Sequence, residues 1–273
     1  MIGQKELLDK INMLISKSGF PQFALLSGDG GSGRKLIASY IAKQLKGHIS
    51  MCGIKADDIR FAVDLVNRTT DRIIIIIADA DNMSLAAKNA LLKVTEEPPQ
   101  NAYFIVTVED EYSMPDTLRS RAYLLKMGVY TPEEIHQVAV DYSNHLNPEE
   151  LDILVNICRT PGEVRTLIDM GVIEFWDYVV KVLDNITAVS VANSFKIAGA
   201  IALKPESEGY DLQIFWRAFM MVCSERMKAE LTDKAKYAEW IKVTSRHMQM
   251  LKVKGANLQM TFDSWIIDIR GVQ

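Results

Sequence analysis

Five consecutive isoleucines, Ile73 to Ile77, constrain the fold of this chain more than any other feature of its sequence. β-Branched side chains favour strands, and a strand places successive side chains on opposite faces of its sheet. A run that is apolar at every position therefore predicts a strand that is covered on both faces. Such strands are typical of the centre of a parallel sheet with helices on each side. The run thus predicts an α/β architecture.

Strand and helix patterns alternate around this run up to about residue 125. The segment 23–28, FALLSG, is a short apolar stretch that ends in glycine, and helical spacing of apolar residues resumes soon after it. The segment 84–97 has a helical pattern that stops at Pro98, and 101–110 is again strand-like. This alternation predicts helices packed on a parallel sheet.

After Tyr130 the strand signal disappears. Thr131 is a predicted helix cap, with Pro132 at the first helical position. Beyond these residues, apolar stripes at helical spacing predict a core formed by helices alone, and 204–211 is the best candidate for a loop within it. A chain of 273 residues is long enough for two or three domains of this kind.

The composition excludes several classes of protein. With 48% hydrophobic and 24% charged residues and no apolar run near the ~18 residues of a membrane helix, we expect a soluble protein without membrane contact. The N-terminal segment lacks the pattern of a secretory signal, so a cytoplasmic location is expected. The net charge of -4 argues against a chain-wide attraction to nucleic acid. Three widely separated cysteines predict neither a disulfide framework nor a metal site.

A glycine-rich loop follows the strand at 23–28. Gly28 and Gly33 have the spacing of a phosphate-binding loop, GxxxxGK[ST], whose backbone N–H groups surround phosphates while its lysine binds the β and γ oxygens and its hydroxyl binds Mg²⁺. Here Arg34 occupies the lysine position and Lys35 the hydroxyl position. The sequence predicts a nucleotide-type loop, comprising Gly28, Gly31, Gly33, Arg34 and Lys35, that has lost its metal ligand. The alternative is a flexible connection between strand and helix.

The acidic motif after the isoleucine run is altered as well. A hydrolytic site of this type needs an aspartate that binds Mg²⁺ and an adjacent carboxylate that activates water. The strand is followed by Ala78, Asp79, Ala80 and Asp81. If Ala78 and Asp79 take the two roles, the metal ligand is missing; if Asp79 and Ala80 take them, the base is missing. Both alignments predict an impaired hydrolytic site.

Three segments together resemble a known family. Residues 2–11 (IGQKELLDKI), 78–106 (ADADNMSLAAKNALLKVTEEPPQNAYFIV) and 118–122 (LRSRA) are similar to the AAA+ subunits of the bacterial sliding-clamp loader of DNA polymerase III, most of all to its delta-prime subunit. The resemblance implies an AAA+ P-loop-type domain with a parallel sheet at 1–126. It further implies a small helical lid at 127–171 and an all-α collar domain for oligomerisation at 172–273.

The resemblance also implies roles for individual residues. Arg121, in a motif similar to SRC, corresponds to an arginine finger that acts on the ATP of a neighbouring subunit. Arg165, in PGEVR, corresponds to the sensor 2 arginine. Lys55 and Arg60 lie near the start of a helix that faces primer-template DNA in the family, so they are expected near phosphates. Without the resemblance, Arg121 would be read as a surface arginine and the segment around Lys55 as a solvated helix start.

Two features depart from the family. The sensor 1 position falls at Val108 or Glu109, and a carboxylate there would repel a γ-phosphate. The four-cysteine zinc module is absent, since Cys52 is the only cysteine between the two nucleotide motifs. We therefore expect no metal.

These observations predict a subunit that is not a competent ATPase alone but supplies Arg121 in trans during sliding-clamp loading in DNA replication. The implied partners are other clamp-loader AAA+ subunits in a hetero-oligomeric ring, the sliding clamp and primer-template DNA. No cofactor is required, and whether a non-hydrolysed adenine nucleotide occupies the loop stays open. An active but atypical ATPase, with Arg34 or Lys35 on the phosphates and Asp79 or Asp81 on Mg²⁺, is one alternative. An AAA+-derived adaptor that never meets a clamp is another.

Overall fold

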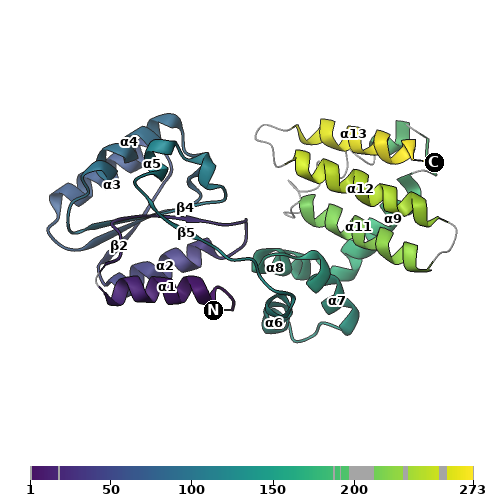
Figure 1. The fold of residues 1–273 in the computed structure, drawn as a ribbon, viewed down its shortest axis with the longest axis horizontal. Coiled ribbons are helices and arrows are strands. Elements are labelled where there is room, and N and C mark those ends of the chain that lie inside the picture. Colours follow the sequence, from purple (N-terminus) through teal and green to yellow (C-terminus); the bar gives the residue numbers. More distant parts are fainter. Residues whose placement is uncertain are drawn as a thin grey trace. The chain divides into compact units, whose positions relative to one another are not determined.

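A computed structural model of the chain describes residues 2–17, 19–186, 188–190, 192–196, 212–229, 233–251 and 257–272. The chain divides into two compact units, Met1–Tyr130 and Thr131–Gln273, hereafter the first and the second unit (Figure 1). The loop expected at 204–211 lies outside the described residues. The predicted lid at 127–171 and the predicted collar at 172–273 both fall largely in the second unit, and their separation into two domains stays a prediction.

The first unit is built on a parallel sheet of five strands in the order β2-β3-β4-β1-β5. The strands are β1 Phe23–Ser27, β2 His48–Cys52, β3 Ile73–Ile77, β4 Ala102–Val108 and β5 Tyr123–Lys126. The isoleucine run forms β3, between β2 and β4, and its five side chains are at most 2% exposed. The predicted buried strand of a parallel sheet is thus confirmed.

Helices cover both faces of this sheet. They are α1 Lys5–Ser16, α2 Arg34–Leu45, α3 Ala56–Arg68, α4 Leu85–Glu96 and the short α5 Asp116–Arg119, with single 3₁₀ turns at Ala80–Asn82 and Glu111–Ser113. Ile74 and Ile76 pack against α1 and α2, whereas Ile73, Ile75 and Ile77 pack against α3 and α4. Burial of each such side chain stabilises the fold by about 1.5–3 kcal/mol. Successive side chains of β3 point to opposite faces of the sheet. This one strand therefore contributes to two hydrophobic cores.

The described part of the second unit is helical. Its helices are α6 Pro132–Tyr142, α7 Pro148–Ile157, α8 Pro161–Met170, α9 Val172–Ile186, α11 Leu212–Ala229, α12 Lys234–Met250 and α13 Leu258–Gly271. The predicted cap at Thr131 is confirmed, since its Oγ1 accepts a hydrogen bond from the backbone N–H of Glu134 at 3.2 Å. Such a cap satisfies an N–H that the first turn leaves without an intrahelical partner.

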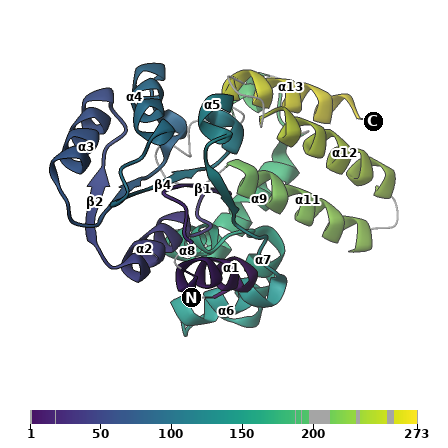
Figure 2. The same ribbon diagram turned by 60° about the vertical axis from the view of Figure 1, so that its left-hand side comes forward.

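The helices α11, α12 and α13 lie side by side (Figures 1 and 2). Large aromatic side chains that are at most 1% exposed fill the space between them: Trp216, Phe219, Trp240, Phe262 and Trp265. The polar edge of a buried indole needs a partner, and Trp265 Nε1 donates to Thr244 Oγ1 at 2.9 Å. The apolar stripes at helical spacing are thus core positions, as predicted.

The described residues form neither a membrane-spanning helix nor a group of metal ligands. No described helix is long and apolar enough to cross a membrane. Within the same residues, no three histidine, cysteine or acidic side chains are grouped so that they could hold a metal ion.

Candidate functional site

The glycine loop lies where the sequence predicts, between β1 and α2. Gly31 and Gly33 have φ angles of 74° and 92°, a region that side chains other than glycine rarely adopt. Gly28 allows a close approach of the chain, because a Cβ at this position would lie 2.5 Å from Cβ of Met127. The conformation of this loop therefore depends on its glycines, whereas phosphate binding by the loop stays a prediction.

Arg34, in the lysine position, turns back across this loop. Its side chain is buried, and Nη1 donates a hydrogen bond to the carbonyl oxygen of Gly28 at 2.5 Å. Nη2 lies 3.1 Å from Oε1 of Glu109 and 3.6 Å from Oδ1 of Asp79. The guanidinium thus joins the first glycine of the loop to two carboxylates of its own chain.

Lys35, in the hydroxyl position, is also paired. Its Nζ lies 2.6 Å from Oδ2 of Asp79, an aspartate of the acidic motif that follows the isoleucine run. Asp79 has a left-handed φ of 52°, and its backbone N–H donates to Thr107 Oγ1 at 3.1 Å. Both cations of the loop are therefore neutralised within the subunit.

Glu109 supplies an anion to the loop itself. A Cβ on Gly30 would lie 3.0 Å from its Oε1, so the carboxylate lies against the loop. The backbone at Glu109 is fixed by the side chain of Asp81. The carboxylate of Asp81 accepts hydrogen bonds from the backbone N–H groups of Glu109 and Asp110 at 2.8 and 3.2 Å. Asp81, one of the two aspartates considered for Mg²⁺, thus already has two backbone donors.

Sequence reasoning identified Glu109 only as a sensor 1 departure and missed its pairing with Arg34. A signal was present, because Glu109 directly follows β4, which is the neighbour of β1 in the sheet. The carboxyl ends of adjacent parallel strands meet at one edge, where the glycine loop also lies.

The buried hydroxyl of Ser32 marks the underside of the loop. Ser32 is 2% exposed, and its Oγ has no hydrogen-bond partner among the described residues, whereas its carbonyl oxygen accepts a bond from the hydroxyl of Tyr130 at 2.7 Å. Tyr130 is the last residue of the first unit. The loop is therefore bonded to the end of the segment that leads out of this unit.

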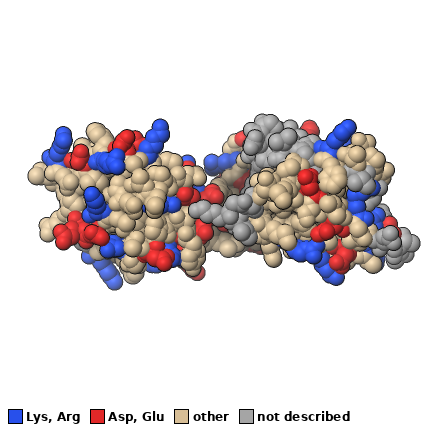
Figure 3. All heavy atoms as spheres, turned by 90° about the horizontal axis from the view of Figure 1, so that it is seen from above, with Lys and Arg blue, Asp and Glu red and all other residues tan. Residues whose placement is uncertain are grey.

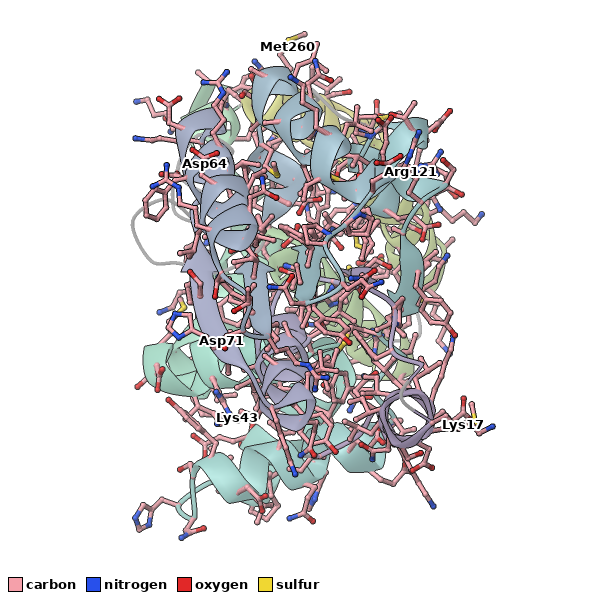
Figure 4. All side chains as sticks on the ribbon, turned by 90° about the vertical axis from the view of Figure 1, so that its left-hand side faces the viewer. Lys17, Lys43, Asp64, Asp71, Arg121 and Met260 are labelled. Carbon is pink, nitrogen blue, oxygen red and sulfur yellow. The ribbon has the colours of Figure 1, made fainter. Side chains whose placement is uncertain are left out.

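Arg121 lies just beyond α5, at the periphery of the first unit (Figure 4). Its Nη1 donates to the carbonyl oxygen of Thr117 at 2.6 Å, and its Nη2 lies 3.0 Å from Oε1 of Glu96 at the end of α4. The arginine side chain is 36% exposed, so solvent and other molecules have access to it. The sequence analysis did not identify Glu96 as a partner of Arg121.

The other arginine of the LRSRA motif has a different environment. Arg119 pairs with Asp116, and its guanidinium carbon lies 4.4 Å from the ring centroid of Tyr112. A cation above an aromatic face stabilises local structure. Of the two arginines, Arg119 is the one built into the turn that follows β4.

Arg165 lies on α8 in the second unit. Its guanidinium carbon is 5.5 Å from the ring centroid of Tyr142, whose hydroxyl donates to the carboxylate of Asp169 at 2.9 and 3.1 Å. This hydrogen bond to Asp169 is the main cause that raises the pKa of Tyr142 above its ordinary value. The predicted sensor 2 role of Arg165 stays a prediction.

The two residues expected near DNA lie at the start of α3, and each has an acidic neighbour. The backbone N–H of Lys55 donates to Asp58 Oδ2 at 3.1 Å, and Arg60 Nη1 lies 2.7 Å from Asp57 Oδ1. On the face of the molecule seen in Figure 3, basic and acidic side chains are interspersed over both units. DNA contact by Lys55 and Arg60 stays a prediction.

The described cysteines are unsuited to nucleophilic chemistry at neutral pH. Burial, followed by the charge of Asp58, raises the pKa of the Cys52 thiol to about 11. Burial likewise raises the pKa of Cys223 to about 12, and that of Cys158 is raised as well. Because the thiolate is the reactive form, these side chains act as apolar packing groups.

Comparison with known proteins supports the resemblance inferred from the motifs. Residues 48–130 match the family model described as "DNA polymerase III, delta subunit". The chain is 28% identical over 205 residues to DNA polymerase III subunit gamma of Buchnera aphidicola subsp. Schizaphis graminum, which covers 62% of this chain and 56% of that protein. It is 25% identical over 170 residues to subunit tau of Escherichia coli, which covers 50% of this chain and 26% of that protein.

Archaeal and structural relatives agree with these matches. Replication factor C small subunit of Methanoregula boonei is 21% identical over 188 residues, with 62% of this chain and 57% of that protein covered. The solved structure of the Thermotoga maritima RuvB Holliday junction branch migration motor has a TM-score of 0.51 at 17% identity, over 81% of this chain and 88% of that one. The chain spans little more than half the length of the first curated relative, 56%.

Together the matches confirm the fold class and the resemblance to AAA+ clamp-loader subunits. The structural likeness, at 17% identity, shows the fold alone. The curated relatives are gamma, tau and small subunits, so the assignment to delta-prime among clamp-loader subunits stays a prediction.

Proposed function

We propose that this chain, an AAA+ protein of the DNA polymerase III clamp-loader type, is a non-hydrolysing subunit of the delta-prime kind that contributes Arg121 to the ATP site of a neighbouring subunit. The family match over residues 48–130 and the similarity to gamma and tau support the assignment to the clamp-loader type. The geometry of the loop supports the absence of hydrolysis by this chain, and the position of Arg121 supports its role at a neighbouring ATP site.

The observation that carries the proposal is the internal pairing of both loop cations. In a working loop the residue after the last glycine reaches the β and γ oxygens of the nucleotide. Here Arg34 contacts Gly28, Asp79 and Glu109 instead, and Lys35 contacts Asp79. A triphosphate would have to replace these carboxylates and would bring further negative charge towards them.

The same arrangement disfavours Mg²⁺. This ion requires near-octahedral coordination by oxygen ligands. The hydroxyl that should bind it is replaced by the ammonium group of Lys35, and the metal aspartate is replaced by Ala78. Asp79 is paired with Lys35, and Asp81 accepts two backbone hydrogen bonds. The alternative of an atypical ATPase needs these same groups for the phosphates and the metal.

Arg121 is the catalytic group in this proposal. A guanidinium near a transferred phosphoryl group offsets the negative charge that develops there, and arginine fingers raise the rate by about 10³–10⁵. Arg121 is partly exposed at the surface of the first unit, whereas Arg34 is buried in the loop. The subunit would therefore control turnover in its neighbour while having none of its own.

The partners in this proposal are other AAA+ subunits in a hetero-oligomeric ring, together with the sliding clamp and primer-template DNA. No cofactor is required for the trans role. The helical collar at 172–273 would hold the ring together, and the described helices α11, α12 and α13 in it share a buried aromatic core. Lys55 and Arg60 would contact DNA phosphates, and such contacts position a protein without reading base sequence.

The first prediction concerns Arg121 in the assembled complex. Arg121→Ala should lower the maximal rate of ATP hydrolysis by about 10³ at the adjoining site, because the developing charge loses its counter-ion. Arg121→Lys should restore little, since an ammonium lacks the planar fork of the guanidinium. Single-turnover phosphate release from the assembled loader measures both effects.

The control for this experiment is the state of assembly. Gel filtration should give the same complex for the wild type and both variants, because Arg121 is partly exposed and contacts only Thr117 and Glu96 among the described residues. Wild-type hydrolysis by an intact Arg121→Ala complex would show that the arginine has no role in trans.

A further inference from the structure

We propose that Glu96 is a positioning residue that holds Arg121 against its own subunit until the phosphates of a neighbouring nucleotide replace it. This inference rests on the proposed trans role of Arg121. It assigns a second residue to that role, one that restrains the arginine rather than contacting the nucleotide.

Both terminal nitrogens of Arg121 are engaged within the first unit. Nη1 donates to Thr117 O at 2.6 Å, and Nη2 lies 3.0 Å from Glu96 Oε1. A guanidinium binds phosphate best through two parallel N–H donors. The guanidinium has five N–H donors, and a phosphate that binds it across Nη1 and Nη2 would have to compete with Thr117 and Glu96 for this edge.

Glu96 lies at a position where a carboxylate is itself disfavoured. It is the last residue of α4, and Glu97 follows it. The C-terminus of a helix has a partial negative charge, so acidic side chains there are destabilised and a nearby cation is favourable. Arg121, in the loop after α5, supplies that cation. The end of α4 therefore fixes the position of the Arg121 side chain when no nucleotide is bound nearby.

The ion pair between Arg121 and Glu96 is weak enough for a phosphate group to displace Glu96. The two side chains are 36% and 56% exposed, and exposed ion pairs shift an equilibrium by a factor of at most about five. A phosphate group carries more negative charge than a carboxylate and can likewise accept two parallel N–H bonds from a guanidinium. Glu96 can therefore hold Arg121 in the absence of a neighbouring triphosphate and compete for it, at a cost in rate, when one is bound.

The test compares Glu96→Gln with Glu97→Gln in the assembled loader. Glu96→Gln removes the charge that holds Arg121 and should raise the maximal rate of ATP hydrolysis about two- to fivefold at low salt. The gain should shrink as salt increases, because screening weakens the wild-type pair. Glu97→Gln removes the adjacent exposed charge, for which the described residues record no ion pair, and should leave the rate unchanged.

A double variant separates positioning from a merely structural role. If Glu96 acts through Arg121, adding Glu96→Gln to Arg121→Ala should change nothing. A gain of the same size in both backgrounds, or no gain in the wild-type background, would overturn the inference. Failure of the proposed function gives a different result, namely wild-type hydrolysis by Arg121→Ala itself.

Discussion

At the scale of single residues, the loop differs from a working phosphate site in the groups that pair with its two cationic side chains. Carboxylates of the same chain pair with them in place of nucleotide phosphates. Arg34 could in principle bind a phosphate, but Glu109 lies in contact with it and against Gly30. A carboxylate of the chain therefore takes the contact that a nucleotide would make. The substitution at the lysine position and the acidic residue at the sensor 1 position act together.

We predict that Glu109→Gln allows the loop to bind nucleotide without metal. The change removes the closer carboxylate of Arg34 and leaves the contact to Asp79 at 3.6 Å. Hydrogen bonds to charged groups contribute about 1.5–3 kcal/mol, so ATP without Mg²⁺ should bind roughly tenfold tighter or more than to the wild-type chain. Isothermal titration calorimetry on the isolated protein measures this difference.

A matched control removes a carboxylate elsewhere. Asp64→Asn changes an exposed side chain of α3 (Figure 4) and alters the net charge by the same amount. It should leave nucleotide affinity as in the wild type. Equal affinities for the wild type and Glu109→Gln would mean that Glu109 does not exclude the nucleotide.

Residue identities were predictable from the sequence, whereas their partners were not. The loop glycines, Arg34 and Lys35 follow from spacing alone. The contacts of Arg34 with Glu109 and of Arg121 with Glu96 join positions 75 and 25 residues apart. Such pairs depend on strand order and on side-chain rotamers, neither of which a motif specifies.

At the scale of elements, continuous apolar runs predicted the inner strands well. The edge strand β2 was not predicted, because its residues His48 to Cys52 are half-buried or exposed and form no apolar run. The short β5 at the opposite edge was missed as well, because its apolar part, Tyr123 to Leu125, is only three residues long. Edge strands pack against one neighbour only, so their sequences are less constrained by burial.

One contact between elements of the second unit has a measurable consequence. Arg217 of α11 lies 2.7 Å from Glu163 of α8, and the two side chains are 10% and 12% exposed. Arg217 Nε also donates to the carbonyl oxygen of Ile157. The PGEVR motif is therefore bonded to the helices beyond residue 172, in addition to the proposed role of Arg165.

We predict that Arg217→Met lowers the free energy of unfolding of the second unit by roughly 3 kcal/mol, because it leaves the largely buried carboxylate of Glu163 without its cation. Arg226→Met is the matched control, since Arg226 pairs with Asp184 at a more exposed position and should cost at most about 1 kcal/mol. Urea unfolding followed by tryptophan fluorescence measures both, because all 4 tryptophans lie in the second unit. Equal losses would argue against the importance of the buried pair.

At the scale of the whole molecule, the chain joins an α/β unit to a helical unit. The first unit has the sheet, glycine loop and candidate finger; the second has the candidate sensor 2 arginine and the aromatic helical core. Alternating strand and helix patterns predicted the first unit and the loss of strand signal after Tyr130 predicted the second. The division of the second unit into a lid and a collar rests on the family resemblance and stays a prediction, because periodicity alone does not separate one group of helices from the next.

The central claim is that the subunit has no hydrolytic site of its own. The most direct measurement is phosphate release by the isolated chain at saturating ATP, with and without Mg²⁺. The internal pairing of Arg34 and Lys35 predicts a rate equal to background in both conditions. Steady, Mg²⁺-dependent release that Asp79→Ala abolishes would contradict it.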